Sequence, residues 1–332
     1  MSTPLHRYSL RSRIRRIALI ASLLVLLPLL LLSAGCAQRV AVDHYLAGVL
    51  AEEEQQIETA ISQFEASVAI DPTMTLSFSA LGHIYHQKGQ LEMAADSFER
   101  AIALDTRDFS DHHTLGLIYE ELGNVEYAIR VLKQAAYIDN MHLDTHVRLM
   151  QLHLNQGDYA SAEPYARRTS ELDPNNSVRF TTLGSIYSHL QRLNDAADAY
   201  TYSVQLDAEQ PEVLLSLGNT HLKLKKFELA EPLFRKIISV DNTFAPAHEQ
   251  LGYCLLNLGR YQQAVDSYGR AVSADQKYAG GHTGLGGAYV ALYLTNGKDD
   301  GLLANAIGAW NRSLEINPDQ PRLRELLDRY MQ

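Results

Sequence analysis

The sequence predicts an all-α protein built from tandem helical hairpins, and three recurring features lead to this prediction. A Leu-Gly pair returns every 34 residues along most of the chain. An Ala stands 13 residues after the Leu in all but the last of these copies, and a bulky or aromatic residue follows four positions later in most of them. Several copies end in Asp-Pro or Asn-Pro, as at Asp71-Pro72, Asp173-Pro174 and Asn317-Pro318. A fixed period of this length indicates a repeat architecture.

The repeat keeps one register through six consecutive intervals, with Leu149-Met150 filling the one gap in the Leu-Gly series. An earlier copy at Ala47-Gly48 is degenerate but in phase. The pairs stand at Leu81-Gly82, Leu115-Gly116, Leu183-Gly184, Leu217-Gly218, Leu251-Gly252 and Leu285-Gly286, and the later small residues are Ala94, Ala128, Ala162, Ala196, Ala230 and Ala264.

Each copy is expected to begin with a helix whose apolar stripe includes the Leu-Gly pair. Phe78, Leu81, Gly82 and Tyr85 have the i, i+3, i+4, i+7 spacing of one helix face. The Gly and the later Ala are small, so two helix backbones can cross closely. One hairpin cannot bury its apolar face alone, and stacked neighbours therefore supply a continuous core.

The last copy departs from the register. Its Ala306 and Trp310 come eight residues later than expected, and the surplus is Leu294–Gly301, which reads as a lengthened loop. The Gly-rich run Gly280–Gly287 falls inside the first helix of the last copy and is predicted to weaken that helix. It has neither a preceding strand nor a following Lys-Ser/Thr pair, so it does not predict a phosphate loop. Residues 321–332 are expected to form a capping helix.

These offsets resemble the tetratricopeptide repeat, a 34-residue helix–turn–helix unit. The resemblance covers residues 41–320 and gives eight repeats. It implies a right-handed superhelix whose first helices line a concave groove that binds proteins or peptides. An extended or helical peptide would suit a surface with polar anchors and apolar pockets.

In this family the groove-facing positions of the first helix lie two residues before and two and five residues after the repeat Leu. They are polar and His-bearing in the N-terminal half and more apolar toward the C-terminus. The Lys, Arg and Asn set with which one family variant holds the carboxylate of chaperone tails is missing. The candidate partner-binding residues are His83, His86, His113, Gln151, Asn219, Glu249 and Tyr253.

Residues 1–35 are interpreted as an export signal of the lipoprotein type or an N-terminal anchor. Five Arg precede an apolar run over residues 17–32, and no acidic residue accompanies them. Sixteen apolar residues are short for a bilayer span, which needs about 20. Positive charge before the run predicts that the rest of the chain crosses the membrane.

The end of this segment, Leu32-Ser33-Ala34-Gly35-Cys36, resembles the lipobox of bacterial lipoproteins. That resemblance makes Cys36 the lipidated first residue of the mature chain, followed by a short tether over 36–40. The motif prefers Leu where Ser33 stands. Two alternatives remain: an uncleaved anchor helix over residues 17–35, or ordinary cleavage near Ala37. With two membranes, Ala37 after the Cys resembles outer-membrane sorting.

Without the leader, the chain has 24 basic and 39 acidic residues, a net charge of about −15 with His neutral. An acidic surface repels phosphate backbones, so nucleic acid is excluded as an expected partner. If Cys36 is lipidated, Cys254 stands alone and no intramolecular disulfide forms. The oligomeric state is left open.

The thirteen His are mostly interpreted as packing rings. His83, His86 and His113 differ, because all three project toward the groove on adjacent helices. A zinc site usually needs a third and fourth ligand, so no metal is predicted. A pH-sensitive peptide contact is a further reading of these three. The ring positions of the repeat hold His44, His112, His146, His153, His221, His248 and His282.

No catalytic motif is present, so neither an enzyme nor a cofactor is predicted. The leading hypothesis is an exported, membrane-anchored scaffold of the bacterial cell envelope. Such a protein resembles the lipoproteins that help assemble pili, secretion machines, peptidoglycan or polysaccharide. One alternative is an assembly factor held by an uncleaved N-terminal helix. Another is a glycan- or metal-binding accessory subunit of an envelope enzyme, using His83, His86 and His113.

Overall fold

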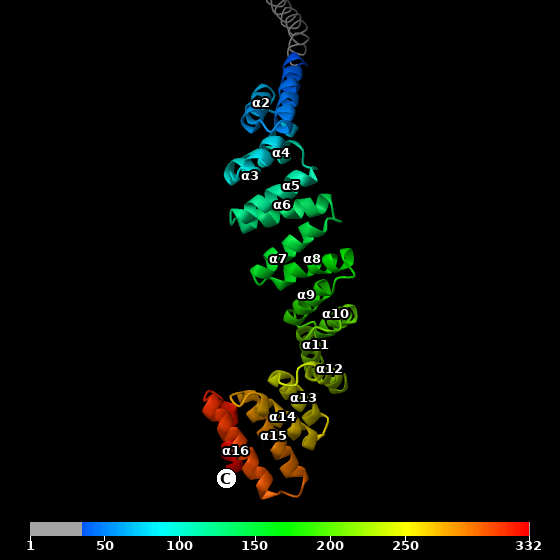
Figure 1. Ribbon diagram of the computed structural model, residues 1–332, viewed down its shortest axis with the longest axis vertical. Helices are drawn as coiled ribbons and strands as arrows, with labels where there is room; N and C mark the ends of the chain where they lie inside the picture. Colours follow the sequence, from blue (N-terminus) through cyan, green and yellow to red (C-terminus); the bar gives the residue numbers. More distant parts are fainter. Residues whose placement is uncertain (1–34, 332) are drawn as a thin grey trace, which may run out of the picture. The chain divides into compact units, whose positions relative to one another are not determined.

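The computed structural model describes residues 35–331, and its regular structure in that range is entirely α-helical (Figure 1). The all-α repeat fold predicted from the sequence is confirmed. The chain divides into two compact units, with the division after Leu149. We refer to the part up to Leu149 as unit 1 and to the part from Met150 as unit 2.

Unit 1 contains a helical stretch over residues 35–53 and then antiparallel hairpins whose first and second helices alternate along the chain. The division between the units falls inside α7. The helices are α2 (Ile57–Ile70), α3 (Thr75–Gln87), α4 (Leu91–Leu104), α5 (Phe109–Glu121), α6 (Val125–Ile138) and α7 (Leu143–Asn155).

Unit 2 continues the same alternation and ends with a single helix. Helix α17 contacts α16, and α13 contacts both α14 and α15. The helices are α8 (Tyr159–Leu172), α9 (Ser177–His189), α10 (Leu193–Leu206), α11 (Pro211–Lys223), α12 (Phe227–Val240), α13 (Ala245–Asn257), α14 (Tyr261–Ala274), α15 (Ala279–Thr295), α16 (Asp300–Ile316) and α17 (Pro321–Met331).

The Leu-Gly pair has a packing explanation. A Cβ atom at Gly82 would lie 2.8 Å from the Phe98 ring, and one at Gly218 would lie 2.6 Å from the Phe234 ring. Both rings are fully buried. Because nonbonded carbons are best separated by about 3.5–4.0 Å, only glycine leaves room for these rings. The glycine of the first helix and the bulky residue of the second therefore recur together.

The last hairpin corrects the expectation of a lengthened loop over Leu294–Gly301. Helices α15 and α16 have 17 residues each, whereas α13 and α14 have 13 and 14. The connection between them is only residues 296–299. The inserted residues mostly extend both helices, because the apolar stretch before Thr295 continues the helix. The turn then ends at Asp299, whose side chain caps α16 by accepting from the Gly301 backbone N–H at 2.8 Å.

The short tether expected over residues 36–40 is helical, because the helix over 35–53 includes these residues. The Ser67 hydroxyl donates to the Ala41 carbonyl at 2.8 Å, which ties this helix to α2. Cys36 is exposed. The rest of the proposed leader lies outside the described residues. Within 35–331, no helix combines the length and apolarity required to cross a bilayer.

Candidate partner-binding surface

The predicted groove residues all lie on first helices, but the structure brings only some of them together. His83 and His86 lie on α3 and His113 on α5, all in unit 1. Glu249 and Tyr253 lie one turn apart on α13 in unit 2. The other two candidates, Gln151 on α7 and Asn219 on α11, belong to neither cluster. The Gln151 side chain donates to Asn155 on its own helix at 2.7 Å.

In unit 1, His83 lies next to a buried carboxylate. Asp111 is 1 % exposed, and it accepts a hydrogen bond from the Ser79 hydroxyl. Nε2 of His83 is 4.0 Å from an Asp111 carboxylate oxygen. Burial raises the pKa of Asp111, while the Ser79 hydrogen bond and the nearby His83 oppose the rise. Asp111 was not predicted as a groove residue; it stands two residues before His113, the nearest predicted groove position.

His113 belongs to a second polar cluster in unit 1. The Thr145 hydroxyl lies 3.0 Å from His113 Nδ1 and 2.8 Å from His142 Nδ1, so it joins the two rings. His113 Nε2 is 3.5 Å from a carboxylate oxygen of Asp144. Burial lowers the pKa of His113, and His142 and Arg148 lower it further. This ring is therefore held mainly in its neutral form.

The three groove His residues do not converge on one point. His83 and His113 face Asp111 and Asp144, and His86 Nε2 lies 3.6 Å from a carboxylate oxygen of Glu121. Across residues 35–331, no group of three or more His, Cys, Asp or Glu side chains has the geometry to hold a metal ion.

Several His that were interpreted as packing rings share one contact. His146, His248 and His282 are buried, and Nε2 of each contacts the backbone carbonyl six residues before it at 2.9–3.1 Å. The rings thus fill a core position while one edge contacts the loop that precedes the helix. This geometry fits the packing interpretation for these three residues.

Glu249 and Tyr253 line a cavity of about 430 Å³ in unit 2, between α13, α15 and the start of α17. Glu249 accepts hydrogen bonds from the Tyr278 hydroxyl and, at 3.4 Å, from the Gln250 side chain. Tyr253 is 45 % exposed. The remaining lining residues are Gln250, Tyr268, Gly280, Thr283, Gly284 and Gln320.

Glycines of α15 make this cavity possible. A Cβ at Gly280 would lie 2.4 Å from a Glu249 carboxylate oxygen, and a Cβ at Gly284 would lie 2.0 Å from the Tyr268 ring. From the sequence, the Gly-rich run was expected only to weaken its helix. It remains helical here, and two of its glycines keep side-chain atoms away from Glu249 and Tyr268.

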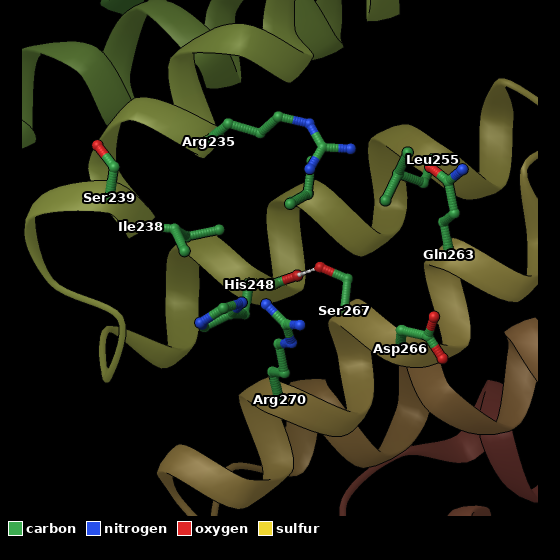
Figure 2. A pocket seen from close by; sticks show the side chains of 10 residues that line it. Arg235, Ile238, Ser239, His248, Leu255, Gln263, Asp266, Ser267 and Arg270 are labelled. Atoms are coloured by element: carbon green, nitrogen blue, oxygen red, sulfur yellow. Dashed lines mark hydrogen bonds between the residues drawn. The ribbon is translucent and has the colours of Figure 1, made fainter.

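A second cavity of about 490 Å³ lies among α12, α13 and α14 (Figure 2). Figure 2 shows the Ser267 hydroxyl donating to the His248 carbonyl, a bond of 2.9 Å. Arg235 of α12 and Arg270 of α14 also line it and lie on opposite sides of His248 in this view. Phe78 and Phe180 stand at the same repeat position as His248, three residues before the repeat Leu. Smaller clefts lie beside both rings, so a space at this position recurs along the array.

The antiparallel hairpins, the glycine–ring contacts and the first-helix surfaces define an all-α helical-repeat solenoid. Family models described as TPR repeat or tetratricopeptide repeat match residues 82–123, 112–140, 181–249 and 233–266. The chain belongs to the tetratricopeptide-repeat family. No curated protein matches it.

The chain is similar to several solved structures. The chain resembles the structure of Naa15/Naa10 bound to HypK-THB with a TM-score of 0.61 and 17% identity, covering 86% of this chain and 44% of that chain. MamA from Desulfovibrio magneticus RS-1 is 17% identical, with a TM-score of 0.48 over 54% of this chain and 97% of that chain. YrrB, a TPR protein with an unusual peptide-binding site, is 16% identical, with a TM-score of 0.40 over 70% of this chain and 98% of that chain.

Stacked helical repeats create extended surfaces that bind other macromolecules. Together with the family assignment, the polar and aromatic side chains on the first helices support a protein-interaction scaffold.

Proposed function

We propose that this protein is an exported, membrane-anchored scaffold of the bacterial cell envelope, and that partner polypeptides bind to its first-helix face. The observation that carries the proposal is the direct joining of an Arg-rich, apolar segment ending at Cys36 to a repeat array. Cys36 is exposed, and Ala41, five residues later, is already buried in the first hairpin. A lipid on Cys36 would therefore hold the array close to the membrane surface.

The binding part of the proposal is supported by the side chains on the first helices. Unit 1 presents the His83 and His113 clusters, and unit 2 presents the cavity beside Glu249 and Tyr253. Anchors of this kind, with cavities between helices, suit the side chains of a bound peptide. We propose assembly of pili, secretion machinery, peptidoglycan or polysaccharide as the setting.

The anchor is tested with Cys36→Ser. The wild-type chain is expected in the membrane fraction, with an intact mass matching a lipidated chain that begins at Cys36. Cys36→Ser should lose both the added mass and the membrane attachment. Cys254→Ala removes a buried thiol elsewhere and should keep both. A chain that still begins at Met1 or Ser2 would instead identify an uncleaved helix, and lipidation would be wrong.

The scaffold role is tested by cross-linking in intact cells followed by purification from membranes. Specific envelope polypeptides should be recovered with the wild-type chain. They should be lost when the first-helix face is blocked by substitutions on α3 and α13. Recovery of no polypeptide under these conditions, with a metal or glycan bound instead, would favour the accessory-subunit hypothesis.

A further inference from the structure

The cavity beside Glu249 contains a hydroxyl group without a partner. Tyr268 is 3 % exposed, and within residues 35–331 no group forms a hydrogen bond with its hydroxyl. Its ring lies between Gly252 and Gly284, where added Cβ atoms would come within 2.8 and 2.0 Å of it. Burial and the Glu249 carboxylate raise the pKa of Tyr268, so the hydroxyl keeps its proton. The hydroxyl lines the cavity, where it is free to bond to a ligand.

The repeat register shows what occupies the equivalent space in unit 1. His113 and Glu249 hold the same position, two residues before the repeat Leu. Each also contacts the ring that stands seven residues before the next repeat Leu. This ring is His142 for His113 and Tyr278 for Glu249. The two sites are therefore built on one plan.

The two sites differ in the helix that follows. In unit 1 that helix supplies Asp144 and Arg148, and Arg148 pairs with Asp144 and with Glu120 at 3.6 and 3.5 Å. At the same two register positions, unit 2 has Gly280 and Gly284. An arginine of the chain itself thus covers the site in unit 1, whereas in unit 2 that side chain is absent and a cavity stands beside the carboxylate.

We propose that the cavity lined by Glu249, Tyr253 and Tyr268 receives an arginine side chain of the bound partner polypeptide. A guanidinium carries five N–H donors in a planar fork that fits a carboxylate, and it stacks on aromatic rings. The Glu249 carboxylate and the Tyr268 hydroxyl accept these N–H groups, and the exposed Tyr253 ring offers a stacking face. No Lys or Arg lines the cavity.

The neighbouring surface indicates which residue accompanies the arginine. A third cavity, of about 420 Å³, shares Thr283 and Gln320 with the cavity beside Glu249, and its wall is mainly apolar, with Leu323 and Leu326. A short apolar side chain beside the arginine fits this wall. The proposal rests on the proposed scaffold function and specifies the partner chemistry of one site.

The test is isothermal titration calorimetry, which measures the affinity of the full mature chain for the peptide acetyl-Ala-Arg-Leu-amide. The same peptide with citrulline keeps the shape of arginine but removes its charge, and a third peptide carries lysine. A charge-assisted hydrogen bond should make the arginine peptide bind about tenfold more tightly than the citrulline peptide. The lysine peptide should bind between them.

Glu249→Gln should reduce the preference for arginine over citrulline to about twofold or less, because the charge is gone. The Gln side chain still accepts the hydrogen bond from Tyr278, so the fold is retained. The matched control is Glu212→Gln, an exposed carboxylate on α11 that does not line the cavity. This control should keep the full preference.

Equal binding of the arginine and citrulline peptides would overturn the proposal, as would binding of neither. Tighter binding of the lysine peptide would also overturn it, and so would a preference that survives Glu249→Gln. Partner capture from membranes distinguishes these failures from failure of the scaffold function. If wild type and Glu249→Gln capture the same polypeptides equally well, only the arginine site is wrong.

Discussion

The two units use the same register positions on the first helices in different ways. In unit 1, charged side chains of the chain itself lie at the site: His113 contacts Asp144 on the next hairpin, and Arg148 contacts Asp144 and Glu120. In unit 2, Gly280 and Gly284 leave the corresponding space open beside Glu249. The comparison shows that the repeat register determines where a side chain lies, while the residue placed there decides whether the site is closed or open to a ligand.

The largest expected effect is on stability. It distinguishes a glycine that lies against a buried ring from a neighbouring glycine with open space around it. Gly286→Ala should lower the free energy of unfolding by about 1–3 kcal/mol, the usual cost of overpacking. Its Cβ would lie 2.3 Å from the Trp310 indole, which is fully buried. The neighbouring Gly287→Ala meets nothing within 4 Å, and it should stabilise the helix by up to about 1 kcal/mol.

Urea titration followed by Trp310 fluorescence measures both substitutions, because Trp310 is the single tryptophan of the chain. Repeat arrays unfold with limited cooperativity, so the transition reports mainly on the C-terminal hairpins. Equal midpoints for the two variants would show that Gly286 is not a packing glycine.

The next prediction concerns the site in unit 1 after removal of the Arg148 side chain. Arg148→Ala removes the pairs with Glu120 and Asp144, which are partly exposed. Stability should change by no more than about 1 kcal/mol, since exposed ion pairs contribute little. The variant should acquire weak binding of the arginine peptide, whereas wild-type unit 1 should not bind it. Chemical-shift changes confined to residues of α5 and α7 would measure this gain, and their absence would break the comparison.

The sequence predicts the register of the hairpins because the contacts that set it repeat within each copy. The glycine–ring contact, as at Gly82 and Phe98, joins residues 16 apart in every copy that keeps it. The extension of α15 and α16 was not predicted, because Gly and Asp in Leu294–Gly301 indicate a turn without fixing where the helices stop.

The cavity in unit 2 was also missed, although Glu249 and Tyr253 were identified. Its opening depends on what stands opposite them in the next hairpin, more than 25 residues away. Aligning Gly280 and Gly284 with Asp144 and Arg148 would have revealed it, because glycines then replace a charged pair. The unpartnered hydroxyl of Tyr268 has no sequence signal, since it depends on the packing of three helices.

A smaller effect concerns pH in unit 1. The pKa of His113 is lowered by burial, His142 and Arg148, and Asp144 opposes this. The folded state therefore binds fewer protons than the unfolded state below pH about 6.5. Stability of this region should fall by no more than about 1 kcal/mol as the pH drops from 7.5 to 5.5. His113→Gln should flatten this dependence.

Hydrogen exchange of peptides from α5 and α6, corrected for intrinsic rates at each pH, measures the change locally. Faster corrected exchange at pH 5.5 in wild type, absent in His113→Gln, is the expected result. Slower exchange at the lower pH would mean that Asp144 outweighs burial, and the cluster would then be stabilised by protonation.

The smallest effect compares the two cysteines, which lie at opposite extremes of exposure. Burial, followed by the nearby Glu231 and Glu228, raises the pKa of the Cys254 thiol to about 11. The thiol also donates to the Phe227 carbonyl at 3.0 Å. Because only the thiolate reacts readily, iodoacetamide at pH 8 should leave Cys254 unmodified in the folded protein. In a chain produced without residues 1–35, the exposed Cys36 should be alkylated.

Intact-mass analysis should then show one added group before unfolding and two in urea. Labelling of Cys254 at the rate of Cys36 would show that α13 opens readily in the native state. Because Glu249 and Tyr253 lie on the same helix, a mobile α13 would also remove the rigid wall on which the proposed arginine site depends. Protection of Cys254 therefore tests whether the open cavity of unit 2 is a preformed site, which binds with less entropy loss than one that must be ordered by its ligand.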